Sequence, residues 1–327
     1  MNKSFAEYLN LYFTEYLTNQ LNASSETIKT YKQVFKSLIN YITNIKEIEI
    51  RKLNFDIITK ELILDYLHYL EDNKHNSIKT RNLHLAVIKS FYQYIKLDNP
   101  TLVLNIQNIL NIRTKKTSSK LREYLTIDEV DKLLSSINTK TRKGRRDLVL
   151  LSVLYDSAVR VSELINIKLM DLRLDNNPTL IVLGKGRKYR TIPLMENTKN
   201  LLIQYINENK FLNTSYLFSN AKGEILNVRT IQLMLNKYLK LSNCDKHISP
   251  HSIRRTRAIH LLEAGINVVI IKDILGHASI TTTDIYVKDC EELKRKAIKE
   301  AYSNVFDNVE VTSWNKDENL LNKLLSL

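Results

Sequence analysis

Apolar residues recur at steps of three or four along much of this chain, and residues that favour helix N-termini stand just before several of these series. In the first 112 residues Ser24 or Ser25, Thr59 and Ser77 can each cap such a helix, and a further helix is expected over residues 5–18. The apolar positions that define the three capped helices are Ile28, Tyr31, Phe35, Leu38 and Ile42; Ile63, Tyr66, Leu67 and Leu70; and Leu83, Val87, Phe91 and Ile95. The pattern predicts an all-helical N-terminal domain over residues 1–112.

The remainder of the chain is predicted to be mainly helical as well. Thr126 and Glu129 form a capping-box pattern before an apolar series, and the nearly continuous apolar run 147–155 indicates a buried helix. Gly265 and Gly276 are placed as C-terminal stops. The further helices expected here cover residues 196–209, 228–241, 250–264 and 268–275.

One small antiparallel sheet interrupts the helices. The β-rich runs Thr179–Leu183 and Tyr189–Leu194 flank the sequence Gly184-Lys185-Gly186-Arg187, in which the glycines supply the backbone freedom of a turn. We therefore expect a β-hairpin with a basic tip inside a mostly helical domain.

The chain is strongly basic, and the excess charge is unevenly distributed. Its 49 Lys and Arg against 35 Asp and Glu give a formal net charge of +14. Residues 1–112 hold 13 basic and 11 acidic residues, so a net of +12 falls in residues 113–327. This balance suggests a polyanionic partner bound through salt-sensitive phosphate contacts, and solubilising surface lysine is the alternative.

Cysteine usage and hydropathy indicate a cytoplasmic protein without a metal centre. The two cysteines, Cys244 and Cys290, fit neither a disulfide framework nor a zinc-ligand spacing. No apolar run reaches the ~18 residues needed to span a bilayer, and the N-terminus lacks the apolar stretch of a secretory signal. We expect no metal, no membrane partner and a cytoplasmic location.

A basic segment follows the N-terminal domain. Arg113, Lys115, Lys116, Lys120 and Arg122 fall within ten residues that contain no acid and no regular apolar period. The segment 113–123 is interpreted as a linker to a second domain over residues 124–305. It is either a basic strap across a DNA backbone or a plain flexible hinge.

Several segments of the second domain concentrate residues suited to a phosphate. Arg160 and Glu163 stand three apart and can share a helix face, where the Arg fork could bind phosphate oxygens and the carboxylate could orient it. An exposed Arg–Glu pair is the commoner explanation of this spacing. A Ser-Pro start at 249–250 would place His251 and Arg254 on one face near a helix N-terminus, which itself attracts anions.

The next such segment ends at a tyrosine. Gly276-His277 follows a predicted helix, and Tyr286 comes nine residues after His277; as one of 17 tyrosines it could be an ordinary core residue. The order Arg160, Lys185 in a hairpin, His251-x-x-Arg254, Gly276-His277 and Tyr286 resembles the active-site pattern of the tyrosine recombinases, the family of phage integrases and Xer-type recombinases. The resemblance covers about residues 4–300. The chain departs from the family at Ala158, where Gly is usual, and at Arg255, where His is common.

The resemblance implies a reaction and a role for each site residue. Tyr286 would attack a DNA phosphodiester, leaving a 3′-phosphotyrosine and a free 5′-hydroxyl, without metal, ATP or any other cofactor. His251 would help to remove the phenolic proton, Lys185 would protonate the departing 5′-oxygen, and Glu163 would orient Arg160 or His251. The groups implied to bind the phosphate are Arg160, Arg254 and His277. The residues expected to contact DNA are Arg113, Lys115, Lys116, Lys120, Arg122, Arg187, Lys188 and Arg255.

The resemblance also implies partners and leaves some functions open. A SAM-like core-binding domain over 1–112 and the catalytic domain would hold a specific duplex DNA site, with a homotetramer on two such sites. Type IB topoisomerase activity shares this chemistry and is one rival; a non-catalytic regulator, which would be expected to lack Tyr286 or an arginine, is another. Integration, transposition, inversion and chromosome-dimer resolution all stay open.

A tail over residues 306–327 follows the expected catalytic domain. Leu320, Leu321, Leu324 and Leu325 form an apolar stripe at helical spacing, and a helix this short needs a surface on which to bury it. The tail either packs on its own domain or, as the family resemblance implies, docks on a neighbouring protomer.

Overall fold

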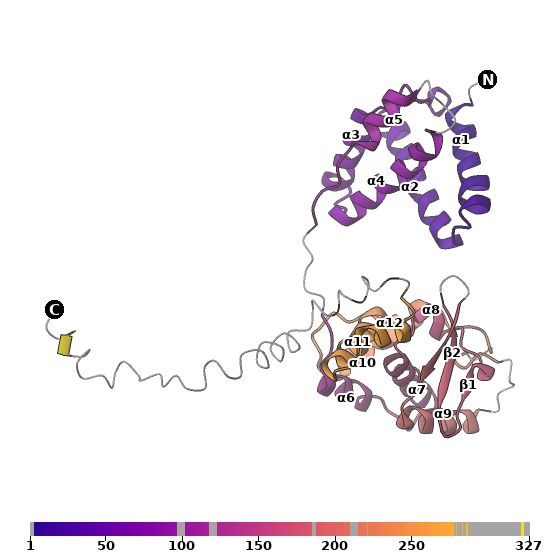
Figure 1. The fold of residues 1–327 in the computed structure, drawn as a ribbon, viewed down its shortest axis with the longest axis vertical. Helices are drawn as coiled ribbons and strands as arrows, with labels where there is room; N and C mark the ends of the chain where they lie inside the picture. Colours follow the sequence, from indigo (N-terminus) through magenta and orange to yellow (C-terminus); the bar gives the residue numbers. More distant parts are fainter. Residues whose placement is uncertain are drawn as a thin grey trace. The chain divides into compact units, whose positions relative to one another are not determined.

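The computed structural model describes residues 3–96, 102–117, 123–184, 188–209, 215–220, 222–277, 279, 283, 286 and 322–323. The chain divides into two compact units, Met1–Lys120 and Leu121–Leu327 (Figure 1). The predicted tail over 306–327 lies almost wholly outside the described residues, as do Lys120, Arg122, Lys185 and Arg187.

The N-terminal unit is all-helical in its described residues, as predicted. Ser24, Thr59 and Ser77 cap their helices, each side chain accepting a hydrogen bond from the backbone N–H three residues later. The helices are α1 (Phe5–Leu11), a π-helix (Tyr12–Gln20), α2 (Ser25–Asn44), a 3₁₀ turn (Ile50–Lys52), α3 (Lys60–Asp72), α4 (Ile78–Ile95) and α5 (Val103–Leu110).

Three features of this unit differ from the sequence prediction. The first helix changes to π-type pairing at Tyr12, and α5 was not foreseen. The placement of Leu83 on the buried face of α4 was wrong, because its side chain is 44% exposed while Leu85 and Ile88 are buried. The core that these helices enclose is rich in aromatic rings gathered around Tyr12.

The second unit, Leu121–Leu327, is mainly helical in its described residues, with its core built around α7 (Arg142–Ser157). Helix α7 packs against α11 (Pro250–Glu263) on one side and α9 (Glu196–Glu208) on another (Figure 1). The predicted capping box is confirmed, since Thr126 and Glu129 bond reciprocally at the start of α6. The other helices are α6 (Ile127–Ser135), α8 (Val161–Leu164), a 3₁₀ turn (Leu169–Asp171), α10 (Val228–Leu241) and α12 (Val268–Leu275).

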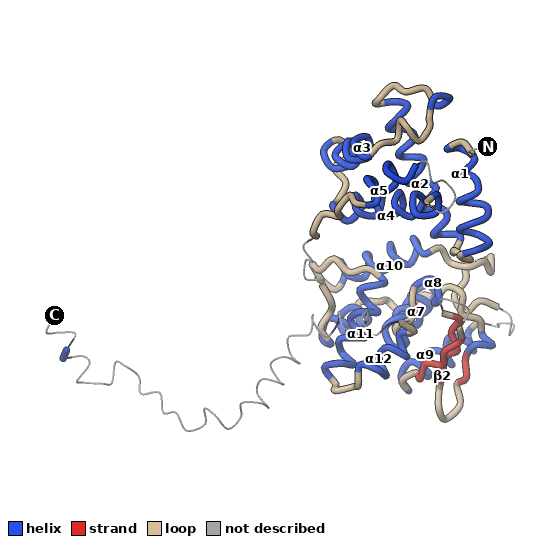
Figure 2. Tube along the Cα trace, turned by 45° about the horizontal axis from the view of Figure 1, so that its top comes forward, coloured by secondary structure: helices blue, strands red, loops and turns tan. Residues whose placement is uncertain are grey.

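A three-stranded antiparallel sheet completes this unit (red in Figure 2). The predicted strands are β2 (Thr179–Leu183) and β3 (Tyr189–Pro193), paired with Leu180 opposite Ile192; the two-residue β1 (Leu172–Arg173) was not foreseen. Alternation along β3 puts Arg190 on the same face as buried Ile192. Among the residues described, no helix combines the length and apolarity needed to cross a membrane.

Candidate active site

Glu163 is the centre around which the candidate site is built. Its carboxylate is 7% exposed and lies in the single turn α8. One oxygen accepts hydrogen bonds from Arg160 Nη1 at 2.8 Å and Arg190 Nη1 at 3.1 Å; the other accepts from Arg190 Nη2 and the Arg160 backbone N–H, both at 2.8 Å. Burial would raise the pKa of Glu163, but the hydrogen bonds from Arg190 and Arg160 outweigh it and hold the pKa below its ordinary value. The carboxylate is therefore charged at neutral pH.

Arg160 approaches Glu163 from the N-cap position of α8 and not from a shared helix face. Its side chain is 34% exposed, and Nη2 also lies 3.4 Å from the Gly276 carbonyl oxygen. An exposed Arg–Glu pair is excluded, since Glu163 is buried. Arg160 thus has one edge fixed to the protein and one edge open to a ligand.

Arg254 lies in α11, which begins as predicted with Ser249 as N-cap and Pro250 in its first turn. The side chain is only 1% exposed; Nη1 donates to the Ala158 carbonyl at 2.9 Å and Nη2 to the Leu275 carbonyl at 2.5 Å. Its ε-nitrogen has no acceptor among the described residues. Burial, and then the charge of Arg160, lower the pKa of Arg254 to about 10, which leaves it charged at neutral pH.

The turn that supplies the Ala158 carbonyl is conformationally unusual. Ala158 ends α7 in the left-handed conformation, with φ 49° and ψ 29°. This is the position where the sequence departs from the glycine usual in the family it resembles. Ala158 forms the same kind of turn that a glycine would allow, but it does so in a backbone conformation that residues with a Cβ rarely adopt.

His277 and Tyr286 lie together beside these arginines. Their rings stack with centroids 6.1 Å apart, and His277 Nδ1 lies 2.9 Å from Thr283 Oγ1. Burial, with the charges of Arg254 and Arg160, lowers the pKa of His277 to about 4, so the ring is neutral near pH 7. Tyr286 is 5% exposed and lies in the same apolar cluster as Ala158 and Leu275, the two residues whose carbonyls bind Arg254.

His251 stands at the edge of the site. It is exposed in the first turn of α11, and its charge contributes to the lowered pKa of His277. The structure therefore gathers Arg160, Glu163, Arg254, His277 and Tyr286, with His251 nearby, while Lys185 lies outside the described residues.

Sequence reasoning missed one member of this cluster, Arg190. Its guanidinium holds Glu163 with two hydrogen bonds, and Nε donates to the Ile274 carbonyl at 2.9 Å. The available signal was an arginine on the inward face of a strand, beside Ile192, because a buried arginine needs charged or polar partners.

The cluster carries more positive than negative charge. Three guanidinium groups surround one carboxylate, with Arg254 Nη1 3.9 Å from Glu163 Oε2, which leaves a local net of two positive charges. A partly buried excess of this kind, with an Arg254 ε-nitrogen that lacks an acceptor in the part of the chain that the structure describes, suits an anionic ligand.

The domain matches decide the family. A model of the phage integrase family matches residues 123–292, and a model of the phage integrase N-terminal SAM-like domain matches residues 12–99. The chain belongs to the phage integrase family. It is a tyrosine-type recombinase: the tyrosine recombinase XerD of Rickettsia bellii is 34% identical over 292 residues, covering 84% of this chain and 92% of that protein. An integrase/recombinase of Sinorhizobium fredii is 33% identical over 332 residues, covering 99% of this chain and 98% of the relative.

Solved structures share the fold of this phage integrase family member. The XerH recombinase bound to a palindromic difH substrate aligns with a TM-score of 0.68 at 21% identity, over 85% of this chain and 80% of that one. A λ integrase dimer bound to a core site aligns with a TM-score of 0.65 at 18% identity, over 86% and 97%. The predicted fold, helical first domain and mixed, mostly helical second domain, is confirmed.

The recombinase's expected DNA-contacting residues fall into different environments. Arg113, Lys116 and the hairpin residue Lys188 are exposed. Lys115 is exposed too, but its ammonium pairs with Glu71 at 2.8 Å. Arg255 is 3% exposed in this structure, and its contact with DNA stays a prediction.

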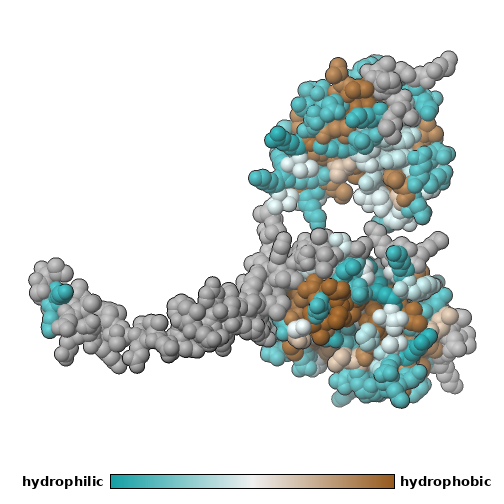
Figure 3. Space-filling view, viewed as in Figure 1, coloured by the Kyte–Doolittle hydropathy of each residue, from teal (hydrophilic) through white to brown (hydrophobic). Residues whose placement is uncertain are grey.

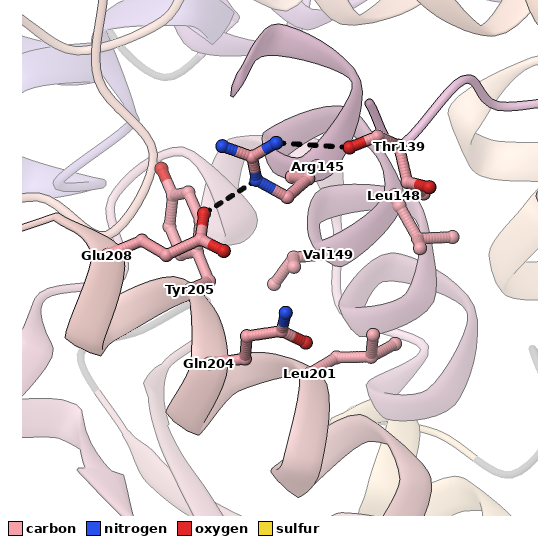
Figure 4. A pocket seen from close by; sticks show the side chains of 8 residues that line it. All are labelled: Thr139, Arg145, Leu148, Val149, Leu201, Gln204, Tyr205 and Glu208. Atoms are coloured by element: carbon pink, nitrogen blue, oxygen red, sulfur yellow. Dashed lines mark hydrogen bonds and ion pairs between the residues drawn. The ribbon is translucent and has the colours of Figure 1, made fainter. Parts of the chain in front are cut away.

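A separate hollow of about 270 Å³ lies between α7 and α9 of the recombinase (Figure 4). Arg145 and Glu208 line it and form an ion pair at 2.7 Å. None of the arginines around Glu163 lines this hollow. It offers no unpaired charge to a phosphate and is not part of the candidate active site.

Proposed function

We propose that this recombinase cleaves and rejoins specific DNA sites through a 3′-phosphotyrosyl link at Tyr286. The observation that carries the proposal is the excess of two positive charges around Glu163, beside the stacked His277 and Tyr286. A phosphodiester carries one negative charge, and the pentavalent phosphorane of its substitution carries two on its non-bridging oxygens. The site is thus matched more closely to the transition state than to the ground state, which is the requirement for catalysis.

The chemistry follows from these placements. The Tyr286 oxygen forms a bond to phosphorus as the bond to the 5′-oxygen breaks, and His251 at the site edge takes the phenolic proton. Arg160, Arg254 and neutral His277 donate hydrogen bonds to the non-bridging oxygens. A free 5′-hydroxyl then attacks the phosphotyrosine in reverse, so the energy of the bond is conserved without a nucleotide cofactor.

Tyr286 requires a change of environment before it can react. It is 5% exposed in this structure, so its hydroxyl is shielded from an incoming phosphate. We propose that assembly on DNA exposes it, so that only some protomers are active at one time.

The decisive test replaces Tyr286 with Phe. Binding the wild-type protein to fragmented DNA from its own source and sequencing the covalently trapped fragments supplies the substrate site. Tyr286→Phe should bind that site within about threefold of wild type and form no covalent adduct, since only a hydroxyl is lost. Tyr205→Phe is the matched control, because Tyr205 is similarly buried in the catalytic unit and donates to the Leu217 carbonyl. Adducts retained by Tyr286→Phe would overturn the assignment.

Lys185 is proposed as the general acid for the leaving 5′-oxygen. Lys185→Ala should cleave ordinary DNA slowly and recover on a 5′-bridging phosphorothiolate, whose sulfur leaves without protonation. Lys188→Ala, a neighbouring exposed lysine of the hairpin, should show no such selective recovery. Equal impairment of Lys185→Ala on both substrates would move the acid elsewhere.

The proposed assembly is a homotetramer on two DNA duplexes, with the tail over 306–327 docking on a neighbouring copy. The support is an apolar patch on the catalytic unit near α11 and α12, where Ile266, Val269 and Ile270 are exposed (Figure 3). A leucine stripe from a second copy would cover such a surface. Deleting residues 308–327 should spare folding and single-site binding while reducing cooperative assembly and recombination. Full recombination by the deletion variant, or its unfolding, would rule out exchange.

A further inference from the structure

Arg190 uses every nitrogen of its guanidinium inside the protein. Nη1 and Nη2 bind the two oxygens of Glu163, and Nε binds the Ile274 carbonyl near the end of α12. The side chain is 12% exposed. This geometry leaves Arg190 no free edge for a phosphate, in contrast to Arg160.

Two glycines make room for this guanidinium. A Cβ at Gly276 would lie 2.9 Å from Arg190 Nη1 and 3.0 Å from Cδ, and Gly276 also has φ +61°, so both space and backbone require glycine there. A Cβ at Gly184 would lie 3.1 Å from the same Nη1. Gly184 is the last described residue before the hairpin tip, and Gly276 directly precedes His277.

Arg190 therefore joins three elements that carry active-site groups. Through Glu163 it reaches Arg160 on α8; through Ile274 and Gly276 it reaches the segment that holds His277; and its own strand β3 forms one side of the hairpin. Among the described residues, no other side chain bonds to both the carboxylate and the end of α12 with all three guanidinium nitrogens engaged.

The bidentate hold on Glu163 has a consequence for Arg160. A carboxylate with both oxygens available binds a guanidinium fork in parallel, the preferred geometry of such pairs. If Arg190 were absent, Glu163 could take both Nη atoms of Arg160 and turn its open edge away from a phosphate. With Arg190 in place, Glu163 accepts Nη1 of Arg160, and Nη2 reaches toward the Gly276 carbonyl.

We infer that Arg190 is a positioning residue of the cleavage reaction, acting through Glu163 to keep Arg160 presented to the scissile phosphate. The inference rests on the proposed function and extends it to a residue that does not touch DNA. A lysine cannot replace Arg190, because one ammonium cannot bind both oxygens of Glu163 in parallel and the Ile274 carbonyl as well.

The test measures single-turnover cleavage by full-length protein on the trapped site. Arg190→Gln and Arg190→Lys should each slow cleavage by about 10- to 100-fold, while DNA binding stays within about threefold. In a protein that already carries Glu163→Gln, adding Arg190→Gln should lower the cleavage rate by less than about a further threefold. The reason is that Arg190 acts on Arg160 through the Glu163 carboxylate, which this variant already lacks. Arg145→Gln is the control, because it breaks a 2.7 Å Arg–Glu pair of the same domain away from the site (Figure 4).

The outcomes separate this inference from the proposed function. Wild-type cleavage by Arg190→Lys, or an undiminished loss from Arg190→Gln in the Glu163→Gln background, would overturn the positioning role. If Arg190→Gln does not fold, Arg190→Lys decides alone. Arg160→Ala separates the proposed function from the positioning role of Arg190. If Arg160→Ala also cleaves at the wild-type rate, the proposed function itself fails. If Arg160→Ala is inactive while Arg190→Lys is fully active, only the role of Arg190 is wrong.

Discussion

Each unit of the molecule contains a shielded carboxylate paired with basic side chains, and the two clusters use their donors differently. In the N-terminal unit Glu71 pairs with Arg81 at 3.4 Å and with Lys115 at 2.8 Å. Asn82 bonds both the N–H and the carbonyl of Lys115, and Arg81 Nη1 reaches the Arg113 carbonyl. These donors fix the start of the linker to its own unit.

The cluster around Glu163 is organised the other way. Arg190 and Glu163 satisfy each other, which leaves Arg160 34% exposed and the ε-nitrogen of Arg254 without an acceptor among the described residues. Burial of an Arg–carboxylate pair is common to both clusters and marks no function. A buried arginine ε-nitrogen without a hydrogen-bond partner among the described residues also occurs in both, at Arg81 and at Arg254. The distinguishing property is the net charge, since three arginines surround Glu163 while one arginine and one lysine pair with Glu71.

The largest expected difference is between two matched carboxylate substitutions. Glu163→Gln should slow single-turnover cleavage by about 10²-fold, because the three arginines lose their common anchor and repel one another. Glu71→Gln should leave the cleavage step within about threefold, since its partners hold only the linker. Equal losses in the two variants would mean that Glu163 contributes no more to the reaction than an ordinary ion pair.

The histidines of the two units sharpen the comparison through their titration. Burial lowers the pKa of both His84 and His277, but only at His277 do the arginine charges add to it and bring the pKa to about 4. A DNA phosphate in the site would neutralise those charges and raise the pKa of His277 toward its ordinary value, leaving His84 unchanged. NMR titrations of the free and DNA-bound protein measure the pKa of each histidine. If the pKa of His277 is the same with and without DNA, the phosphate binds elsewhere.

The sign of the accompanying pH effects follows from the lowered values. In the free protein each histidine has a lower pKa when folded than when unfolded, so the unfolded chain takes up the proton first as the pH falls. The contribution of each neutral histidine to the free energy of unfolding is therefore complete above about pH 6.5 and is lost as the pH drops below that value. For half-buried His277 the loss by pH 4 is roughly 1–2 kcal/mol after allowance for solvent screening. Since DNA raises the pKa of His277, DNA affinity should increase as pH falls from 6.5 toward 4.

The sequence predicted more of this site than of the contacts that organise it. Arg160, Arg254, His277 and Tyr286 follow from motif order, and the caps at Thr126 and Ser249 follow from local hydrogen bonding. The pairing of a strand arginine with Glu163 depends on tertiary packing, which no local pattern reports.

The same limit applies outside the site. The burial of Arg255, which is 3% exposed, could not be predicted from the sequence, and its DNA contact stays a prediction. Lys115 and Lys116 are indistinguishable as sequence, and only the fold places Glu71 beside one of them.

The linker lysines give the next test of how the two clusters differ. Lys116 is exposed and has no ion-pair partner in the described ranges, whereas Lys115 is paired with Glu71 and bonded by Asn82. Lys116→Ala should lower the slope of log affinity against log salt by about 0.9 on cognate and random DNA alike, as expected for one phosphate contact. Lys115→Ala should change this slope by less, and the reverse order would show that Lys115 leaves Glu71 to bind DNA.

The smallest expected effect concerns backbone strain next to Arg254. Ala158 has φ 49° and offers its carbonyl to Arg254 at 2.9 Å, while His75 has φ 51° in a turn of the N-terminal unit. Left-handed conformation is less unfavourable for His than for Ala, so Ala158→Gly should stabilise its unit by about 1 kcal/mol and His75→Gly by less. Thermal unfolding of both variants measures the difference, and cleavage by Ala158→Gly should stay within about twofold because the carbonyl keeps its position. A glycine that stabilises the unit but slows cleavage would instead show that the Cβ of Ala158 holds Arg254 in place, and a destabilised variant would show that packing of that Cβ in the Tyr286 cluster outweighs the strain.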